Sequence, residues 1–282
     1  MSGLPPLKQA TLDAMVQRAL VEDLDDMGDV TSDNTLEPGQ TAEAEIVSKA
    51  VGVLAGTSVA EAVFRKLDSS LKLVWEAEDG VLLEPGTVVG TVSGLARSIL
   101  AAERVALNFL QHLSGVATLT AAYVDACKSH GVDLLCTRKT IPGLRAAQRY
   151  AVAVGGGTLH RGGLFDAILI KTNHCKLAGG ITQAVTRAKA RTALPVEVEV
   201  ETLAELKEAA AAGAERVLLD NADLNLIAEA VREKPDALFL EVSGGVSLET
   251  VEAIAALRPD AISVGKITHS APALDLALHV LD

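Results

Sequence analysis

The sequence has few cysteines, few aromatic residues and no long hydrophobic run. Its three cysteines, Cys127, Cys136 and Cys175, show no CxxC spacing. This argues against a zinc site or a disulfide framework and favours reduced thiols in a cytoplasmic protein. Aromatic residues make up only 2% of the 282 residues, so the core must be aliphatic. No apolar run reaches the roughly 18–20 residues of a membrane span, and no export signal is visible.

Acidic residues outnumber basic ones, and the formal net charge is −12. A field of this sign repels polyanions, so we expect no nucleic-acid partner and no membrane partner. Several basic residues nevertheless gather in one stretch of sequence. Such a group in an acidic protein indicates a small, strongly anionic ligand. Its members are Arg138, Lys139, Arg145, Arg149, Arg161 and Lys171.

Two hydrophobic patterns predict an α/β protein with two domains. From about residue 42 to 94, short alternating segments are separated by turn dipeptides, which is typical of hairpins in an antiparallel sheet. With its flanking helical patterns, this part predicts an N-terminal α/β sandwich domain over residues 1–112. Residues 113–282 are expected to form an open, incomplete parallel α/β barrel, with a last helix near Pro272 able to pack on the first domain.

The second part alternates short β-rich runs with Ala-rich amphipathic segments. This order is typical of parallel strands joined by helical crossovers. Six such units fall short of a complete eightfold barrel, which takes about 250 residues. The strand candidates begin at Val132, Ala167, Val196, Arg216, Ala237 and Ala261.

Polar or glycine residues follow each predicted strand, where parallel barrels carry their reacting groups. One such strand end is ordinary loop chemistry, but six together are better explained by one pocket. Glu197, Glu199 and Glu201 alternate with valines and would share one strand face, roughly 6.6–6.8 Å apart. Buried, they would need compensating cations, for which Lys139, Lys171 and a magnesium ion are candidates. The alternative is an edge strand with a solvated acidic face.

Glycine and histidine supply two further candidates. Ser243-Gly244-Gly245 lies between a strand and a helix, where free backbone N–H groups often bind phosphate. Gly155-Gly156-Gly157 precedes His160 and Arg161, and a helix stop explains one of these glycines. The histidines His112, His130 and His279 lie on helical patterns and are interpreted as structural or surface residues.

The run TRKTIPGLRAAQRYAVAVGGGTLHRGGLFDAILIKTNH, from Thr137 to His174, resembles the quinolinate phosphoribosyltransferases, also called nicotinate-nucleotide pyrophosphorylases (carboxylating). Six further segments follow in the family's order along most of the chain. They are EDLDDMGDVTS at Glu22, ERVALNFLQHLSGVATLT at Glu103, EVEVETL at Glu197, LLDN at Leu218, SGG at Ser243 and SVGKITHS at Ser263.

The resemblance implies a reaction, a fold and an assembly. The enzyme would join quinolinate to phosphoribosyl pyrophosphate (PRPP), release CO₂ and pyrophosphate, and make nicotinate mononucleotide for NAD biosynthesis, with Mg²⁺ as cofactor. The implied fold is an N-terminal α/β sandwich followed by an open α/β barrel. The implied assembly is a homodimer in which Arg104 of one subunit completes the other's active site.

The resemblance also implies roles, position by position. Lys139, Glu199 and Asp220 match catalytic residues, and the two acids also match the metal-binding pair near the ribose. The other matches bind substrate: they grip the quinolinate carboxylates or hold the 5-phosphate. These are Arg104, Arg138, His160, Arg161 and Lys171 for the carboxylates, and Ser243, Gly244, Gly245, Val264 and Gly265 for the phosphate.

Three residues depart from the family pattern. Leu159 stands where Asn is usual, Thr172 where an acidic residue or Asn is common, and Lys266 where a small residue is usual. None removes a matched binding group, but they bear on fine substrate preference. The alternative functions are a lysine-imine aldolase, a molybdenum-transport-associated paralogue with another acceptor, and a non-catalytic phosphate-binding protein.

Overall fold

The computed structural model describes residues 7–282, and their contacts define two compact units. The first contains the N-terminal residues up to 121 together with 140–156 and 267–282, and the second contains 122–139 and 157–266. No single cut of the chain separates them. The domain boundary after residue 112 therefore stays a prediction. By their contacts, residues 140–156 and 267–282 belong to the first unit although they come later in the chain.

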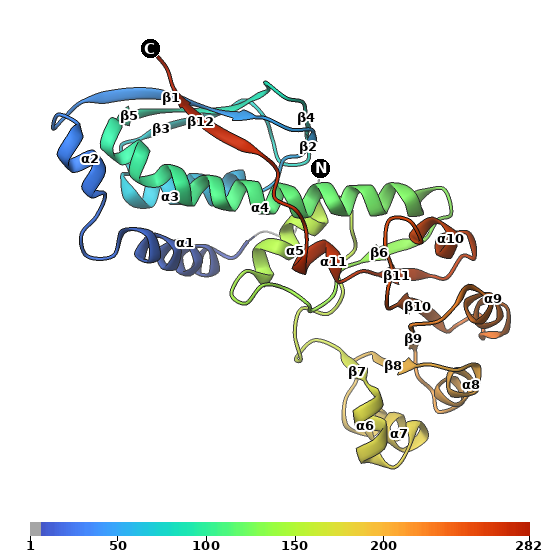
Figure 1. The fold of residues 1–282 in the computed structure, drawn as a ribbon. Helices are drawn as coiled ribbons and strands as arrows, with labels where there is room; N and C mark the ends of the chain where they lie inside the picture. The colour runs from blue at the N-terminus through green and yellow to red at the C-terminus, as the bar shows by residue number, and fades with distance from the viewer. Residues whose placement is uncertain (1–6) are drawn as a thin grey trace. The chain divides into compact units, whose positions relative to one another are not determined.

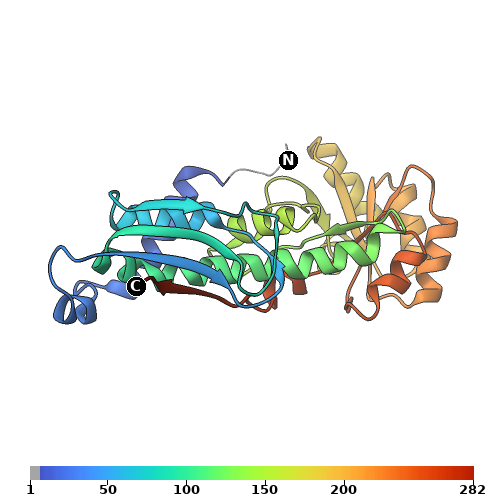
Figure 2. The same ribbon diagram turned by 90° about the horizontal axis from the view of Figure 1, so that it is seen from above.

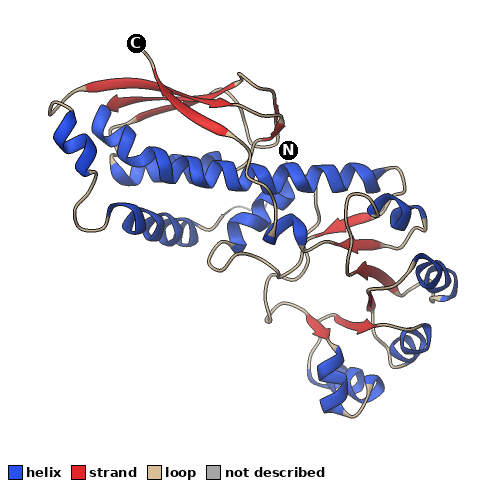
Figure 3. Cartoon of the chain, in the orientation of Figure 1, coloured by secondary structure: helices blue, strands red, loops and turns tan. Residues whose placement is uncertain are grey.

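An antiparallel sheet of four strands in the order β12-β1-β5-β3 forms one layer of the first unit (Figure 3). Along β1 the burial alternates, with Ala44, Ile46 and Ser48 buried, because successive side chains point to opposite faces. The antiparallel sheet predicted from the sequence is confirmed. Its strands are β1 (Thr41–Ser48), β3 (Lys72–Trp75), β5 (Val88–Leu95) and β12 (Leu276–Val280), with a separate pair β2 (Gly52–Val53) and β4 (Leu82–Leu83).

Helices form the second layer of this unit, beneath the sheet in the view of Figure 1 and behind it in Figure 2. Their buried apolar side chains are mostly aliphatic, as expected, and Phe64, Phe109 and Tyr123 are the buried aromatic ones. None of the described helices, the long α4 included, is long and apolar enough to cross a membrane. The helices are α1 (Gln9–Leu24), α2 (Val30–Thr35), α3 (Thr57–Leu67), α4 (Ala96–Lys128, which continues into the second unit), α5 (Arg145–Val154) and α11 (Lys266–His269).

The prediction of a last helix near Pro272 is wrong. Residues Leu276–Val280 form β12, which pairs antiparallel with β1 and joins the first unit's sheet. His279, placed on a helix by the sequence pattern, lies in this strand opposite Glu45. The run Leu-Ala-Leu-His-Val suits either structure, and a free edge on β1 decided between them, because pairing satisfies backbone groups of both strands.

Six parallel strands in the order β6-β11-β10-β9-β8-β7 form the second unit's sheet. The end strands β6 and β7 do not pair with each other, so the barrel stays open as predicted. All six strand candidates are confirmed. They are β6 (Asp133–Leu135), β7 (Ile168–Ile170), β8 (Val196–Val200), β9 (Arg216–Asp220), β10 (Phe239–Ser243) and β11 (Ala261–Ser263).

Helices alternate with these strands and lie along the outer side of the curved sheet (Figure 1). Thr202 and Glu205 form a capping box at the start of one of them: Thr202 accepts the backbone N–H of Glu205, whose carboxylate accepts that of Thr202. This cap starts the helix directly after β8. The helices are α6 (Thr172–Ala178), α7 (Ile181–Arg191), α8 (Leu203–Ala211), α9 (Leu224–Glu233) and α10 (Val251–Ala256).

Candidate active site

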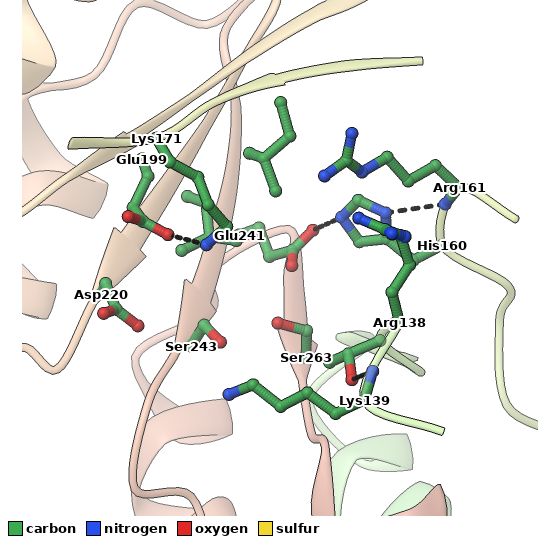
Figure 4. A pocket seen from close by; sticks show the side chains of 13 residues that line it. Arg138, Lys139, His160, Arg161, Lys171, Glu199, Asp220, Glu241, Ser243 and Ser263 are labelled. Carbon is green, nitrogen blue, oxygen red and sulfur yellow. Dashed lines mark hydrogen bonds and ion pairs between the residues drawn. The ribbon is translucent and has the colours of Figure 1, made fainter. Parts of the chain in front are cut away.

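A pocket of about 350 Å³ lies at the C-terminal ends of the second unit's strands (Figure 4). Strand ends supply most of its polar side chains, because parallel strands end at one edge of a sheet. Asp220, Ser243 and Ser263 are the last residues of β9, β10 and β11. The lining residues are Thr137, Arg138, Lys139, His160, Arg161, Leu169, Lys171, Glu199, Leu218, Asp220, Glu241, Ser243 and Ser263.

Two loops bring the basic residues to this pocket. The segment before His160 runs beside β6, with Thr158 N donating to Leu134 O at 2.7 Å and Cys136 N to Thr158 O at 3.2 Å. This pairing sets His160 and Arg161 beside the loop that carries Arg138 and Lys139. After Arg161 the chain turns sharply, since the Asp166 carboxylate accepts the backbone N–H groups of Gly162 and Gly163 at 2.6 and 3.1 Å.

The guanidinium groups of Arg138 and Arg161 influence each other electrostatically. Burial, and the positive charge of Arg138, lower the pKa of Arg161. Two cations held this close at one pocket repel each other, which favours an anionic ligand between them. The pocket therefore contains four of the six basic residues grouped in the sequence, whereas Arg145 and Arg149 lie on α5 in the first unit and do not line it.

Lys171 and Glu199 form the link between the cationic and acidic sides. The Lys171 ammonium pairs with the Glu199 carboxylate, and the Thr172 hydroxyl lies 3.3 Å from the same carboxylate (Figure 4). His174 accepts the Lys171 backbone N–H at Nδ1 over 3.0 Å and so holds the start of the loop after β7. Asp220 lies on the next strand and accepts from Asn221 at 2.8 Å. Glu199 and Asp220 thus line the same pocket as the basic side chains of Arg138, Lys139, Arg161 and Lys171.

The predicted row of three glutamates is only partly correct. Glu201 follows β8 and is exposed, so it does not belong to the pocket. Glu197 is 4% exposed and Glu199 is half-buried. Lys171 compensates Glu199 as expected, but the cations next to Glu197 are Arg216 and His160, which the sequence interpretation did not pair with it.

His160, Glu197, Arg216 and Glu241 form a cluster of charged side chains, of which His160 and Glu241 line the pocket. Nε2 of His160 is 3.2 Å from Glu197 and 3.3 Å from Glu241, and Arg216 contacts both carboxylates at 3.4 Å. The Arg216 guanidinium also stacks 3.7 Å above the Phe239 ring centroid, which holds it in place. We call these four residues the His160 cluster.

The charges of the His160 cluster shift its protonation equilibria. Burial alone would lower the pKa of His160, but hydrogen bonds and Coulomb attraction from Glu197 and Glu241 raise it to about 9. Burial likewise would raise the pKa of Glu241, but His160 outweighs this effect and the pKa is lowered. The Arg161 backbone N–H meanwhile points at Nδ1 of His160 over 2.7 Å. An Nε2 proton therefore faces the two carboxylates. The raised pKa also favours a second proton on Nδ1, and that proton would break the hydrogen bond from the Arg161 N–H, so the two effects oppose each other.

The side chains of His160, Glu197 and Glu241 also lie close enough to surround a metal ion. Arg216 argues against this reading, because its guanidinium contacts both carboxylates and would repel a second cation. Glu241 and Arg216 were missed as site residues. Glu241 carried a signal, because it is a charged residue inside an otherwise apolar strand of a parallel sheet, whose strands are normally buried on both faces. Arg216 is the first residue of β9, where a charged residue is ordinary.

Several predicted site residues do not line the pocket. Arg104 is exposed on α4 in the first unit. Gly244 has φ +90°, and a Cβ there would collide with Asn221, so chain geometry alone already demands glycine. In the Gly155–Gly157 run, Gly155 packs against Ala117 and Gly156 has φ +84°, which gives two of these glycines a structural explanation. The other predicted residues outside the lining are Gly245, Val264 and Gly265.

An open α/β barrel with cations and carboxylates at its strand ends defines an enzyme-type site for small anionic substrates. Models of the N-terminal and C-terminal domains of quinolinate phosphoribosyl transferase match residues 29–114 and 116–279. The chain belongs to this family.

Individual relatives agree with this assignment. A nicotinate-nucleotide pyrophosphorylase [carboxylating] of rice, Oryza sativa subsp. japonica, is 42% identical over 95% of this chain and 77% of its own length. A probable nicotinate-nucleotide pyrophosphorylase of Bacillus subtilis is 38% identical over 90% of this chain and 88% of its own. The solved nicotinate-nucleotide pyrophosphorylase from Francisella tularensis superposes with a TM-score of 0.94 at 40% identity, covering 100% of both chains.

Proposed function

We propose that this protein transfers the phosphoribosyl group of PRPP to quinolinate, with decarboxylation, to give nicotinate mononucleotide, pyrophosphate and CO₂. One observation carries the proposal. Arg138, Arg161 and Lys171 line one pocket together with Glu199 and Asp220. Such a pocket suits a dianionic acceptor beside a sugar that becomes positively charged as its leaving group departs.

The basic side chains bind and orient the acceptor. Quinolinate carries two carboxylates, and arginine binds a carboxylate through two parallel N–H donors. Arg138 and Arg161 are the two arginines of the pocket lining, and Lys139 and Lys171 add single charges to it. The clamps hold the pyridine nitrogen toward the ribose carbon, so that attack needs no reorientation of the ring.

The acidic side chains act on the sugar. As the C–O bond to pyrophosphate breaks, positive charge develops at the ribose carbon, and the carboxylates of Glu199 and Asp220 stabilise it and accept hydrogen bonds from ribose hydroxyls. The pyridine nitrogen then forms the new N–C bond. The resulting pyridinium accepts the electron pair of the C–C bond that releases CO₂, and a proton from solvent replaces the lost carboxylate. No covalent enzyme intermediate is needed, so neither Lys139 nor Lys171 forms an imine.

Mg²⁺ is proposed as the cofactor, held by Glu199 and Asp220. The donor types fit, because magnesium prefers carboxylate oxygens and is usually bound by one or two of them with substrate phosphates. Lys171, which pairs with Glu199 and is half-exposed, would have to turn to the acceptor to leave Glu199 for the ion. When bound, the ion neutralises charge on the departing pyrophosphate. Ser243, Gly244 and Gly245, with Val264 and Gly265, are proposed to hold the 5-phosphate on backbone N–H groups at the same strand ends.

The experiment mixes the purified protein with quinolinate, PRPP and Mg²⁺ and measures nicotinate mononucleotide and ¹⁴CO₂ from carboxyl-labelled quinolinate. We expect the two products in equal amounts. Nicotinate is the control acceptor and is expected to react poorly, because it lacks the second carboxylate. Formation of neither product with quinolinate, or equal use of nicotinate, would contradict the proposal.

We further propose a homodimer in which Arg104 enters the partner's active site. Arg104 is exposed on α4, and the second unit carries exposed apolar side chains beside its pocket: Leu164, Phe165 and Leu177 are 74%, 80% and 89% exposed. Such a patch is typical of a surface that another protein covers. Mixing Arg104→Ala chains with Arg161→Ala chains, each of low activity, tests this, since mixed dimers would regain one intact site and exceed the activity of either variant alone. No recovery after unfolding and refolding the mixture together would contradict a shared site.

The alternatives are less well supported. An aldolase with a lysine imine accounts for Lys171 but not for two arginines in the pocket. A paralogue with another acceptor is not favoured, since the curated relatives have names for quinolinate or nicotinate-nucleotide chemistry. A cytoplasmic location stays a proposal: Cys127 and Cys136 are buried and form no disulfide, while some relatives carry chloroplastic or mitochondrial names.

A further inference from the structure

The His160 cluster is more elaborate than a substrate-binding histidine requires. Two glutamates are buried at a pocket proposed to take a dianion, and Glu241, 0% exposed, lines the pocket itself. Buried carboxylates near an anionic ligand weaken its binding unless cations cancel them. Their presence therefore calls for a role that outweighs this cost.

The contacts of the imidazole ring indicate that role. Nε2 faces Glu197 and Glu241, on β8 and β10, and Nδ1 faces the backbone N–H of Arg161. Both ring nitrogens are thus engaged by the protein, and one of them is tied to the residue proposed to clamp the acceptor. A ring held at both nitrogens cannot rotate without releasing Arg161.

Arg216 completes the arrangement from β9, the strand between β8 and β10. It lies opposite Glu197 in the strand register and contacts both carboxylates at 3.4 Å, so one guanidinium compensates two acids. Ser263 also acts on this cluster, because a hydrogen bond with its side chain helps to lower the pKa of Glu241, and both residues line the pocket.

We propose that Glu197 and Glu241 are positioning residues for the acceptor: through Nε2 of His160 they fix the imidazole ring and hence the Arg161 backbone, while Arg216 cancels their charge. His160 then acts mainly on Arg161 and not as a separate clamp on a carboxylate. The inference rests on the proposed function, because it assigns Arg161 to acceptor binding. Glu197 and Glu241 face the imidazole ring directly, and Arg161 follows it in the chain. Arg216 acts on the ring through the two carboxylates, and Arg138 acts on Arg161.

The test compares Glu197→Gln and Glu241→Gln with the control Glu233→Gln, which removes an ion-paired carboxylate on the surface of α9. Steady-state kinetics measure KM for quinolinate and for PRPP separately. We expect KM for quinolinate to rise about 10- to 100-fold in the two cluster variants, the effect of losing one hydrogen bond to a charged group. KM for PRPP and all constants of the control should stay within about twofold. Equal rises in both KM values, or none, would overturn the proposal.

A spectroscopic measurement uses the unmodified protein and needs no turnover. Nitrogen-15 NMR of histidine-labelled protein, with His160 assigned by His160→Asn, reports which ring nitrogen carries a proton. We expect Nε2 to stay protonated from pH 6 to 8 and its signal to move in Glu241→Gln but not in Glu233→Gln. A proton on Nδ1 alone would overturn the inference even if the enzyme is active. Inactivity with quinolinate together with the expected NMR pattern would instead count against the proposed reaction.

Discussion

Arg161→Ala offers the most direct perturbation of the proposed acceptor site. Arg161 is half-buried at the pocket, and Asp166 fixes the turn that presents it. Removing one clamp from a desolvated charge pair costs about 2–5 kcal/mol. Because Arg161 is only partly buried and Arg138 and Lys171 remain, we expect the lower half of this range. A loss of about 2–3 kcal/mol corresponds to roughly a 30- to 150-fold fall in kcat/KM for quinolinate.

The assay measures initial rates of nicotinate mononucleotide formation at varied quinolinate and saturating PRPP. Arg161→Lys keeps the charge but loses the planar fork, so it should recover only part of the activity. Arg232→Ala, which removes an exposed arginine from α9, is the matched control and should behave like the unmodified protein. Thermal unfolding should be similar for all three variants. An Arg161→Ala enzyme within threefold of the unmodified one would refute the assignment of Arg161 to the acceptor.

Three further predictions concern the acidic side, the cluster and the glycine loop. Glu199→Gln should lower kcat about 100-fold and raise the Mg²⁺ concentration needed for half-maximal rate. Glu201→Gln, which changes an exposed carboxylate, should alter neither quantity. Rates measured over a Mg²⁺ titration of both variants test this prediction. Because the pKa of His160 is raised from 6.5 to about 9, the folded state binds its proton more tightly. The resulting stability is complete below about pH 6.5 and is lost as the pH rises to about 9, by at most about 1.4 kcal/mol per pH unit. Denaturant unfolding at several pH values gives the free energy of unfolding as a function of pH. Its slope should be steeper in the unmodified protein than in His160→Gln, and equal slopes would contradict the prediction. Gly244→Ala should raise KM for PRPP, because φ is +90° and the new Cβ would displace Asn221 beside Asp220. Gly179→Ala, with a similar φ but open space around it, is the control for strain alone.

Local chemistry made much of the fold readable from the sequence. The six parallel strands were predictable because apolar runs alternate with amphipathic segments, and Thr202 with Glu205 marked a helix start that the structure contains. Strand-end positions of Lys171, Glu199 and Asp220 were predictable for the same reason, since a parallel sheet brings its strand ends to one edge. The family followed from ordered motifs that span most of the chain.

Only the tertiary structure decided which groups meet. The segment Leu276–Val280 became a strand because β1 offered an unpaired edge, which no local pattern could reveal. Glu197 faces Arg216 because β8 and β9 pair in that register, and Glu241 joins them from a strand 44 residues further along the chain than Glu197. Sequence determines each residue's chemistry and its local backbone, but the partner of a buried charge depends on strand order and register, which are set by contacts between distant segments.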